Sequence, residues 1–331
     1  MAFRVGGRSP YATPGHLVSL TQPQAQRTVQ EGGAPMRHCA TAFIVMLTLS
    51  IPAAGQGIDL TFFGWSDQHI QANGDWAHCQ PAIEAMLELA GTPYPESIGG
   101  VVAEPAFIIS AGDTTEWPTH AAVESYREMT ALLPWPTYEL AGNHDDGGAV
   151  PSETFLNYVR EKHGSLGYAF DAGGVHFSCL FTSLERGTDN PAGPVFPEQL
   201  AHLRADLAGQ SASTPVVVAM HHCSDSLTNM PEVLEAMAGR RVILVLGGHY
   251  HKPVLTVHGG IPFHQLPSPK SDIPAVTVFR VTDERLVGVT WDYANSAWLD
   301  TPVLDVPLQT PAPGEAGASE ADAGPEGAAQ S

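Results

Sequence analysis

The sequence has few basic residues, and lysine is the scarcest of them. Fifteen Lys and Arg stand against 35 Asp and Glu in 331 residues, giving a formal net charge of −20. Only three residues are lysine: Lys162, Lys252 and Lys270. Such a surface repels the phosphate backbone of DNA and RNA, which excludes non-specific nucleic-acid binding. An anionic substrate would need another source of positive charge, and the 15 histidines indicate bound metal.

Cysteine is also scarce, and its spacing argues against a thiolate site. Cys39, Cys79, Cys179 and Cys223 are scattered and include no Cys-x-x-Cys pair. A structural zinc site built on thiolates is therefore not expected. One disulfide among the last three is compatible with the sequence, which does not choose the pair.

The apolar run at residues 40–51 is too short to span a membrane, which takes about 20 residues. It follows Met36-Arg37 and precedes small residues up to Gly55, which is typical of a secretory signal peptide. We expect residues 36–55 to be this signal, cleaved near Gly55, and residues 1–35 to be a non-native or disordered extension before a true start at Met36. The mature protein would then be exported to the periplasm, cell envelope or medium without a transmembrane helix. The alternative is a buried strand or helix at 40–51 in a cytoplasmic protein.

The folded domain is expected over residues 56–308, because residues 309–331 contain Pro, Ala, Gly and acidic residues typical of a disordered tail. Apolar runs predict strands near residues 58–64, 106–110, 137–140, 167–171, 175–182, 215–220 and 242–246. Amphipathic stretches predict helices near 80–90, 119–133, 152–163, 197–207 and 231–238. Four further strands are predicted near 254–257, 261–265, 275–281 and 286–293. This order predicts an α/β fold in which two sheets pack face to face with helices outside.

Metal-binding side chains follow five of the predicted strands, at the point where each strand ends. They are Asp67 and His69, Asp113, Asn143 to Asp145, His221 with His222, and His249 with His251. Loops at the carboxyl ends of strands in open α/β sheets converge on one edge, where ligands bind. Residues i and i+2 of an extended segment point the same way, so the Asp67–His69 and His249–His251 pairs can each face one centre. Carboxylate and imidazole ligands in this number suit two ions, drawn from Mn, Fe, Zn, Co or Ni.

These residues resemble the five motif blocks of the calcineurin-like metallophosphoesterases. Asp67-x-His69, Gly112-Asp113, Gly142-Asn143-His144-Asp145, His221 and Gly248-His249-x-His251 occur in the family's order. The resemblance implies a four-layer α/β/β/α sandwich of two mixed β-sheets flanked by helices. It also implies a first metal held by Asp67, His69 and His251, a second held by Asn143, His221 and His249, and Asp113 as the bridge. His144 matches the family's catalytic histidine and Asp145 the carboxylate that orients it.

The resemblance further implies a metal-dependent phosphoester hydrolase. Two divalent or mixed-valence ions would lower the pKa of a shared water, and the bridging hydroxide would attack phosphorus in line while His144 assists the leaving group. The chain also resembles, more loosely, the cyclic-nucleotide and glycerophosphodiester phosphodiesterase-like branch, and this likeness fits a general exported phosphatase equally well. Glu116 stands where purple acid phosphatases place a tyrosine ligand. The expected substrate is a small phosphodiester or phosphomonoester. The alternative is a catalytically lapsed phosphoester- or metal-binding protein of the cell envelope, and the oligomeric state is left open.

Several residues near the motif blocks are expected to have structural roles. Strand alternation should let only one residue of the His221–His222 pair face the metal; we favour His221, which leaves His222 to support a ligand or contact substrate. Trp65 and Trp117 are expected in the core, the alternative being that either stacks on a substrate base, and Asp146 is expected in a turn. The segment 184–196 shows no periodicity and is expected to form a loop beside the site.

Overall fold

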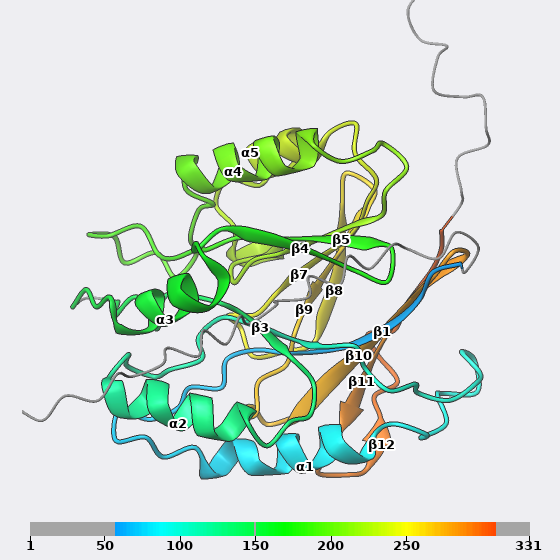
Figure 1. The fold of residues 1–331 in the computed structure, drawn as a ribbon, viewed down its shortest axis with the longest axis horizontal. Coiled ribbons are helices and arrows are strands. Elements are labelled where there is room, and N and C mark those ends of the chain that lie inside the picture. The colour runs from blue at the N-terminus through cyan, green and yellow to red at the C-terminus, as the bar shows by residue number, and fades with distance from the viewer. Residues whose placement is uncertain (1–56, 149, 309–331) are drawn as a thin grey trace, which may run out of the picture. The chain divides into compact units, whose positions relative to one another are not determined.

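The computed structural model describes residues 57–148 and 150–308 (Figure 1). The predicted extension, signal peptide and tail, at residues 1–35, 36–55 and 309–331, lie outside the described residues. None of the described helices has the length and apolar character needed to cross a bilayer.

The first sheet brings three of the motif-bearing strand ends side by side. Its strand order is β12-β11-β10-β1-β2-β3, with β13 paired to β11. The strands are β1 (Asp59–Trp65), β2 (Ile108–Ala111), β3 (Thr137–Leu140), β10 (Ala275–Thr282), β11 (Arg285–Asp292), β12 (Ala297–Trp298) and β13 (Leu304–Pro307). Because β1, β2 and β3 are parallel neighbours, their carboxyl ends meet at one edge, whereas β1 and β10 are antiparallel.

The second sheet supplies the other two motif-bearing strand ends. Its order is β4-β5-β6-β7-β9-β8. The strands are β4 (Tyr168–Ala172), β5 (Val175–Cys179), β6 (Val216–Ala219), β7 (Val242–Gly247), β8 (Val254–His258) and β9 (Ile261–Gln265). Strands β5, β6, β7 and β9 run parallel, and β4 and β8 pair antiparallel at the edges. Both sheets are therefore mixed, as predicted.

Helices cover the outer faces of the two sheets, and one further helix lies to the side, next to the edge strand β3 (Figure 1). They are α1 (Gln80–Glu88), α2 (His120–Thr130), α3 (Thr154–His163), α4 (Pro197–Ala208) and α5 (Met230–Met237). Helices α4 and α5 lie at the top of the view and α1 and α2 at the bottom, with the sheets between them. The predicted α/β/β/α sandwich is confirmed.

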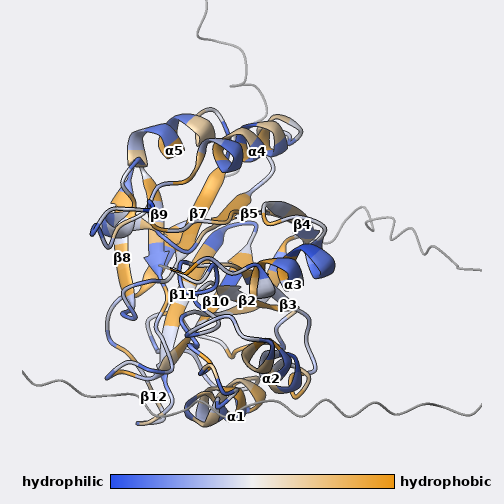
Figure 2. Ribbon diagram, turned by 90° about the vertical axis from the view of Figure 1, so that its left-hand side faces the viewer, coloured by the Kyte–Doolittle hydropathy of each residue, from blue (hydrophilic) through white to orange (hydrophobic). Residues whose placement is uncertain are grey.

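The core forms where apolar strand faces meet. Figure 2 shows the strands of the second sheet as largely hydrophobic, while polar residues gather on the outer helices. Between the sheets, the Phe62 ring lies 5.0 Å from Phe279 of its own sheet and 5.4 Å from Phe177 of the other. A separate cluster that includes Leu203 and Phe263 packs under α4 and α5. Burial of these faces is the main favourable term that holds the layers together.

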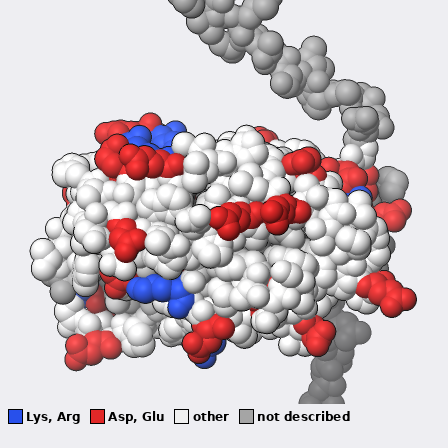
Figure 3. Space-filling view, turned by 90° about the horizontal axis from the view of Figure 1, so that it is seen from below, with Lys and Arg blue, Asp and Glu red and all other residues white. Residues whose placement is uncertain are grey.

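The exposed surface reflects the acidic composition. Figure 3, viewed from the side of α1 and α2, shows several separate patches of Asp and Glu and little Lys or Arg on that face. This face offers no basic track for a polyanion.

Two features depart from the sequence prediction. Strands β12 and β13 were not predicted, because β12 has only two residues and β13 follows Pro302 and ends on Pro307, which reads as a loop. A proline is tolerated in β13 since this strand pairs only with β11. The disulfide left open by the sequence does not form, since Cys79, Cys179 and Cys223 are separate buried thiols. Burial raises the pKa of both Cys179 and Cys223 to about 12, so neither is a reactive thiolate.

Candidate metal centre

The first half of the centre gathers Asp67, His69 and His251. The Nε2 atoms of the two histidines lie 3.0 Å apart. Asp67 Oδ1 lies 3.3 Å from His251 Nε2 and 3.9 Å from His69 Nε2. These three ligand atoms converge from the loops after β1 and β7, which lie in different sheets. The arrangement fits one transition-metal ion.

Asp113 lies between this half and the next. Its Oδ2 is 3.0 Å from His221 Nε2, and its Oδ1 accepts a 2.8 Å hydrogen bond from the backbone N–H of His144. The ligand atoms of Asp67, Asp113 and His221 all lie within 4.8 Å of one another. The carboxylate thus occupies the position of a bridge.

The second half presents three buried atoms that a metal could take as ligands. His221 Nδ1 faces the Ala111 carbonyl at 2.8 Å, and His249 Nε2 faces the Pro191 carbonyl at 2.7 Å. Because a carbonyl only accepts, each of these nitrogens carries a proton, and the opposite nitrogen of each ring is the one available to a metal. Among the described residues, His249 Nδ1 and Asn143 Oδ1 have no partner, and His221 Nε2 has only the Asp113 carboxylate beside it, at 3.0 Å. Buried atoms in this state fit a metal ion.

The charges in the centre also favour a cation. Burial alone would raise the pKa of Asp113, but His221 outweighs it and holds that pKa well below its usual range. Burial alone would lower the pKa of His221, but Asp113 and Asp67 raise it to about 9. Burial lowers the pKa of His69 and of His249 to about 4, so both rings are neutral at pH 7 and able to coordinate.

The backbone reaches this arrangement through bends rather than extended segments. The φ angles are 55° at Asp67, 48° at His69, 50° at Asp113, 81° at His249 and 59° at His251. The predicted extended geometry of the two i, i+2 pairs is therefore wrong, although each pair does face one centre. Left-handed conformations cost energy for residues with a side chain, and their concentration here is typical of a functional site.

The glycines of the motifs are required mainly because a side chain would not fit at their positions. Gly112 has a φ of 93°, and a Cβ built on it would lie 2.6 Å from His221 Nδ1. A Cβ on Gly142 would overlap Asp113 Oδ1, and one on Gly248 would overlap Ser66. Since neither Gly142 nor Gly248 has a positive φ, these two serve close packing and not the sharp turn itself.

The predicted pairing of His144 with Asp145 is not observed. His144 Nδ1 donates to the carbonyl oxygen of Glu116 at 3.0 Å, which leaves Nε2 directed elsewhere. Asp145 is fully buried and accepts hydrogen bonds from the backbones of Gly142, Thr114 and Thr115 and from the Thr115 hydroxyl. It therefore holds the Gly142 loop against the loop after β2. Burial and the Asp113 charge raise the pKa of Asp145 to about 7.

Glu116 is a site residue to which sequence reasoning gave no role. Its Oε2 lies 3.2 Å from His69 Nδ1, and its carboxylate is paired with Lys270. The contact favours the His69 tautomer that keeps Nε2 free for a metal. The available signal was its position three residues after Asp113, which the purple acid phosphatases use for a ligand.

Trp117 and Asp146 also differ from expectation. Trp117 is 47% exposed, with its ring 5.8 Å from that of His144, so it lies at the mouth of the site and not in the core; Trp65 is buried as predicted. Asp146 is buried and accepts a 2.6 Å hydrogen bond from Ser183 at the start of the 184–196 loop. It therefore ties that loop to the centre in addition to lying in a turn.

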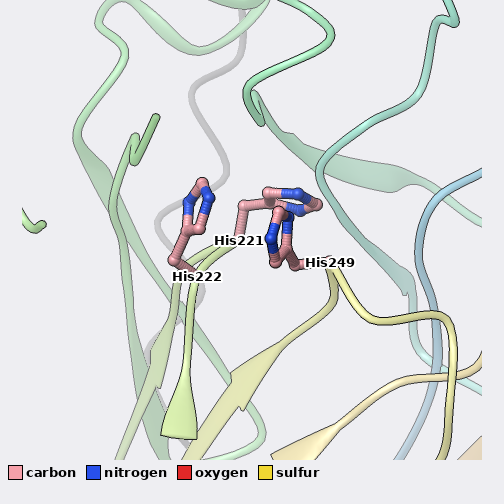
Figure 4. Close-up of side chains that lie close together, drawn as sticks. All are labelled: His221, His222 and His249. Atoms are coloured by element: carbon pink, nitrogen blue, oxygen red, sulfur yellow. The ribbon is translucent and has the colours of Figure 1, made fainter. Parts of the chain in front are cut away.

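His222 lies beside His221 and not away from it. Strand β6 ends at Ala219, so strand alternation does not govern the two histidines that follow. The three rings of His221, His222 and His249 lie close together (Figure 4), with their ligand atoms within 4.8 Å of one another. The ring of His222 is 4.3 Å from that of His249.

A pocket opens beside the first half of the centre. It has a volume of about 700 Å³ and includes His251, Lys252, Lys270, Tyr250, Ile273 and Leu299 in its lining. Two of the three lysines of the chain therefore lie next to the metal-binding residues. The size and mixed lining are those of a small-molecule site.

Comparison with known proteins agrees with this geometry. The family model described as calcineurin-like phosphoesterase matches residues 66–253, more than half of the chain. The chain belongs to this family. A probable cyclic nucleotide phosphodiesterase from Rhodopseudomonas palustris is 28% identical over 172 residues, which cover 48% of this chain and 61% of that protein. This calcineurin-like phosphoesterase thus aligns with less than two thirds of that relative's length.

Solved structures share the fold. A dimetal phosphatase from Danio rerio matches 77% of this chain and 100% of its own, with a TM-score of 0.56 and 15% identity. GAP50, described as the anchor in the inner membrane complex of Plasmodium, matches 76% of this chain and 90% of its own, with a TM-score of 0.51 and 11% identity. At these identities the likeness supports the calcineurin-like phosphoesterase fold alone.

Proposed function

We propose that this protein is a dinuclear-metal phosphodiesterase acting on a small organic phosphodiester. The observation that carries the proposal is the convergence of Asp67, His69, Asp113, His221 and His251 on one buried cluster, from strand ends in two sheets. His249 lies beside His221 in the same cluster, and Asn143, whose neighbour His144 donates to Asp113, has a buried Oδ1 without a hydrogen-bond partner. Asp67, His69 and His251 would hold one ion, and Asn143, His221 and His249 the other, with Asp113 between them.

The residues around the ions would position the substrate and move one proton. When bound, the two ions activate water and neutralise charge on the phosphoryl oxygens. As the bond between phosphorus and the leaving oxygen breaks, His144 Nε2 would donate a proton to that oxygen. The Glu116 carbonyl fixes the ring for this step by accepting from Nδ1 at 3.0 Å. Trp117 and the ring of His69 flank His144 at 5.8 Å and 4.7 Å.

Two observations favour a diester over a monoester. The relative from Rhodopseudomonas palustris carries the name of a probable cyclic nucleotide phosphodiesterase. The pocket of about 700 Å³ beside His251 offers room for an organic group, with Tyr250, Ile273 and Leu299 as apolar lining. A monoester of the same alcohol would leave a second charge to be neutralised, and Lys270 is already paired with Glu116.

Metal content and turnover of the purified protein test the proposal. We expect two transition-metal ions per chain and faster hydrolysis of bis-p-nitrophenyl phosphate and cyclic nucleotides than of p-nitrophenyl phosphate. Chelation should abolish turnover, and Mn²⁺, Co²⁺ or Zn²⁺ should restore it. Fewer than two ions per chain after reconstitution, with no turnover, would contradict the dinuclear assignment.

Two variants separate metal binding from proton transfer. Asp113→Asn should lose metal and turnover together, whereas Asp59→Asn, at the opposite end of β1, should lose neither. His144→Gln should keep both ions but lose about 10²- to 10⁴-fold in turnover. Loss of metal from His144→Gln would show that this histidine is a ligand.

The alternative is a phosphoester- or metal-binding protein of the cell envelope that has the same cluster but no turnover. We further propose that the mature chain is exported, on the strength of residues 36–55. A protein that binds metal and phosphate but hydrolyses none of the three substrates would favour the binding role.

A further inference from the structure

His222 is a fully buried histidine beside the centre to which the family motifs assign no role. Its side chain is not exposed, and its ring lies 5.0 Å from that of His221 and 4.3 Å from that of His249. Its Nε2 has no hydrogen-bond partner among the described residues. An unpartnered buried nitrogen costs about 1–3 kcal/mol, so it calls for an explanation.

The contacts of the Thr182 hydroxyl show which ring nitrogen of His222 carries the proton. The hydroxyl oxygen of Thr182 accepts from the backbone N–H of His222 at 2.9 Å and lies 3.1 Å from His222 Nδ1. Thr182 is itself fully buried, and within the described residues its hydroxyl has no other acceptor. If Nδ1 carried the proton, the hydroxyl hydrogen would be left without an acceptor. The hydroxyl therefore donates to Nδ1, and the His222 proton is on Nε2.

This tautomer sets His222 apart from its two neighbours. His221 and His249 each donate from one ring nitrogen to a backbone carbonyl, so that the opposite nitrogen can give its lone pair to a metal once any proton there is released. His222 has the opposite state, because its free nitrogen is an N–H. An N–H cannot bind a cation but can donate to an oxyanion. The geometric proximity of the three rings is thus not a three-histidine metal site.

The surroundings of His222 hold the ring in this position. The 184–196 loop packs against the ring, so closely that a Cβ added to Gly193 would lie 3.3 Å from His222 Cδ2. The same loop supplies the Pro191 carbonyl that orients His249. The backbone N–H of Gly193 donates to the Ser226 carbonyl at 2.9 Å and closes the loop over both rings. His222 is therefore locked before any ligand binds.

We propose that His222 donates a hydrogen bond from Nε2–H to an oxygen of the phosphoryl group bound at the second half of the centre, with Thr182 as its positioning residue. The proposal rests on the proposed function and goes beyond it, because it assigns a donor that the ligand set does not contain. No proton is transferred in this step. The bond strengthens as negative charge collects on the oxygen, which is where such a donor contributes most.

Nuclear magnetic resonance of the histidine rings tests the tautomer without any turnover. In the long-range ¹H–¹⁵N spectrum of the metal-free and zinc-loaded protein, assigned with His222→Gln, we expect Nε2 of His222 to carry hydrogen in both states. In Thr182→Val we expect the His222 signals to shift toward the other tautomer. Loss of the Nε2 proton on zinc binding would make His222 a ligand and overturn the proposal.

Binding of inorganic phosphate to the zinc-loaded protein tests the role, measured by calorimetry. We expect His222→Leu to keep two ions per chain and to bind phosphate about 10- to 100-fold more weakly, as for loss of one bond to a charged group. His222→Gln, which retains an N–H donor, should lose less, and Thr182→Val should lie between wild type and His222→Leu. His120→Gln, at the exposed start of α2, is the matched control and should bind as wild type does.

Different outcomes would contradict the proposed function and the role of His222. Wild-type protein that binds neither two ions nor phosphate overturns the proposed function and this inference with it. Wild-type protein that binds both, with His222→Leu binding phosphate equally well, overturns the inference alone. Loss of one ion in His222→Leu also overturns it, because the residue would then be a ligand.

Discussion

His264 offers a test of the core that is independent of the metal centre. It lies on β9 between the two sheets, with its ring 5.3 Å from that of Phe279, and it is fully buried. Both ring nitrogens lack hydrogen-bond partners among the described residues. Burial lowers its pKa from 6.5 to about 4, and only the neighbouring Gln265 backbone acts in the opposite direction. No charged side chain takes part in this shift.

The sign of the pH dependence follows from this lowered pKa. Between pH 6.5 and about 4 the unfolded chain holds a proton on His264 that the folded chain does not. Stability therefore falls as the pH drops through this window. The whole pKa shift of His264 corresponds to about 3 kcal/mol in the free energy of unfolding, of which about 2 kcal/mol is lost between pH 8 and pH 5.

Replacement of His264 by leucine, which has a similar volume, should remove this loss. We expect urea unfolding of His264→Leu and wild type to diverge by about 2 kcal/mol between pH 8 and pH 5, with the variant relatively more stable at pH 5. Because both proteins contain the same metal centre, its own pH dependence cancels in the difference. His120→Gln, at an exposed histidine, should show no such divergence. A difference between His264→Leu and wild type that stays constant over this range refutes the reasoning.

Three further predictions concern the site and its support. Gly142→Ala should weaken metal binding at least about 10-fold without unfolding the protein, since the new Cβ overlaps Asp113; metal titration measures it. Metal binding at pH 7 should release about one proton from His221, whose pKa is raised to about 9, and calorimetry in buffers of different ionisation enthalpy detects the proton. Glu139→Gln should cost about 1–2 kcal/mol at pH 7, because His163 and the partly exposed Lys162 lose their buried carboxylate partner. Burial alone would raise the pKa of Glu139, but the side chains that donate hydrogen bonds to its carboxylate hold that pKa low. The stability lost in Glu139→Gln should therefore become smaller as the pH falls below about 4.5, which urea unfolding at a series of pH values measures.

The strand ends that carry the site could be predicted from the sequence, because each strand is a run of apolar residues that stops at polar residues or glycine. The buried strand 242–246 and the glycines that follow it, for example, leave little choice but a strand ending before His249. Parallel pairing of β1, β2 and β3 then places Asp67, Asp113 and Asn143 at one edge. Topology thus decided most of the ligand set.

The hydrogen-bond partners of the site residues depend on the local backbone conformation, which the spacing of apolar residues in the sequence does not determine. Asp145 follows His144 directly, so the sequence suggested a pair, yet the left-handed bend at Asp113 turns backbone N–H groups toward Asp145 and leaves His144 to the Glu116 carbonyl. The outcome for His222 has the same origin. Because β6 ends at Ala219, before the two histidines, strand alternation no longer sends their side chains to opposite faces. Contacts between side chains on different loops therefore could not be predicted from the sequence.

The buried carboxylates of the centre link metal binding to folding. Asp67, Asp113 and Asp145 are each fully or nearly fully buried within one small region. The positive charge that offsets them in the metal-free protein comes from His221, which must give up its proton to coordinate. Two divalent ions replace that single charge and bind only the folded arrangement, since the ligands come from five separate loops. Stability should therefore rise with free metal concentration, and thermal unfolding with and without chelator measures the coupling. Equal melting temperatures in the two conditions would mean that these carboxylates do not need the ions.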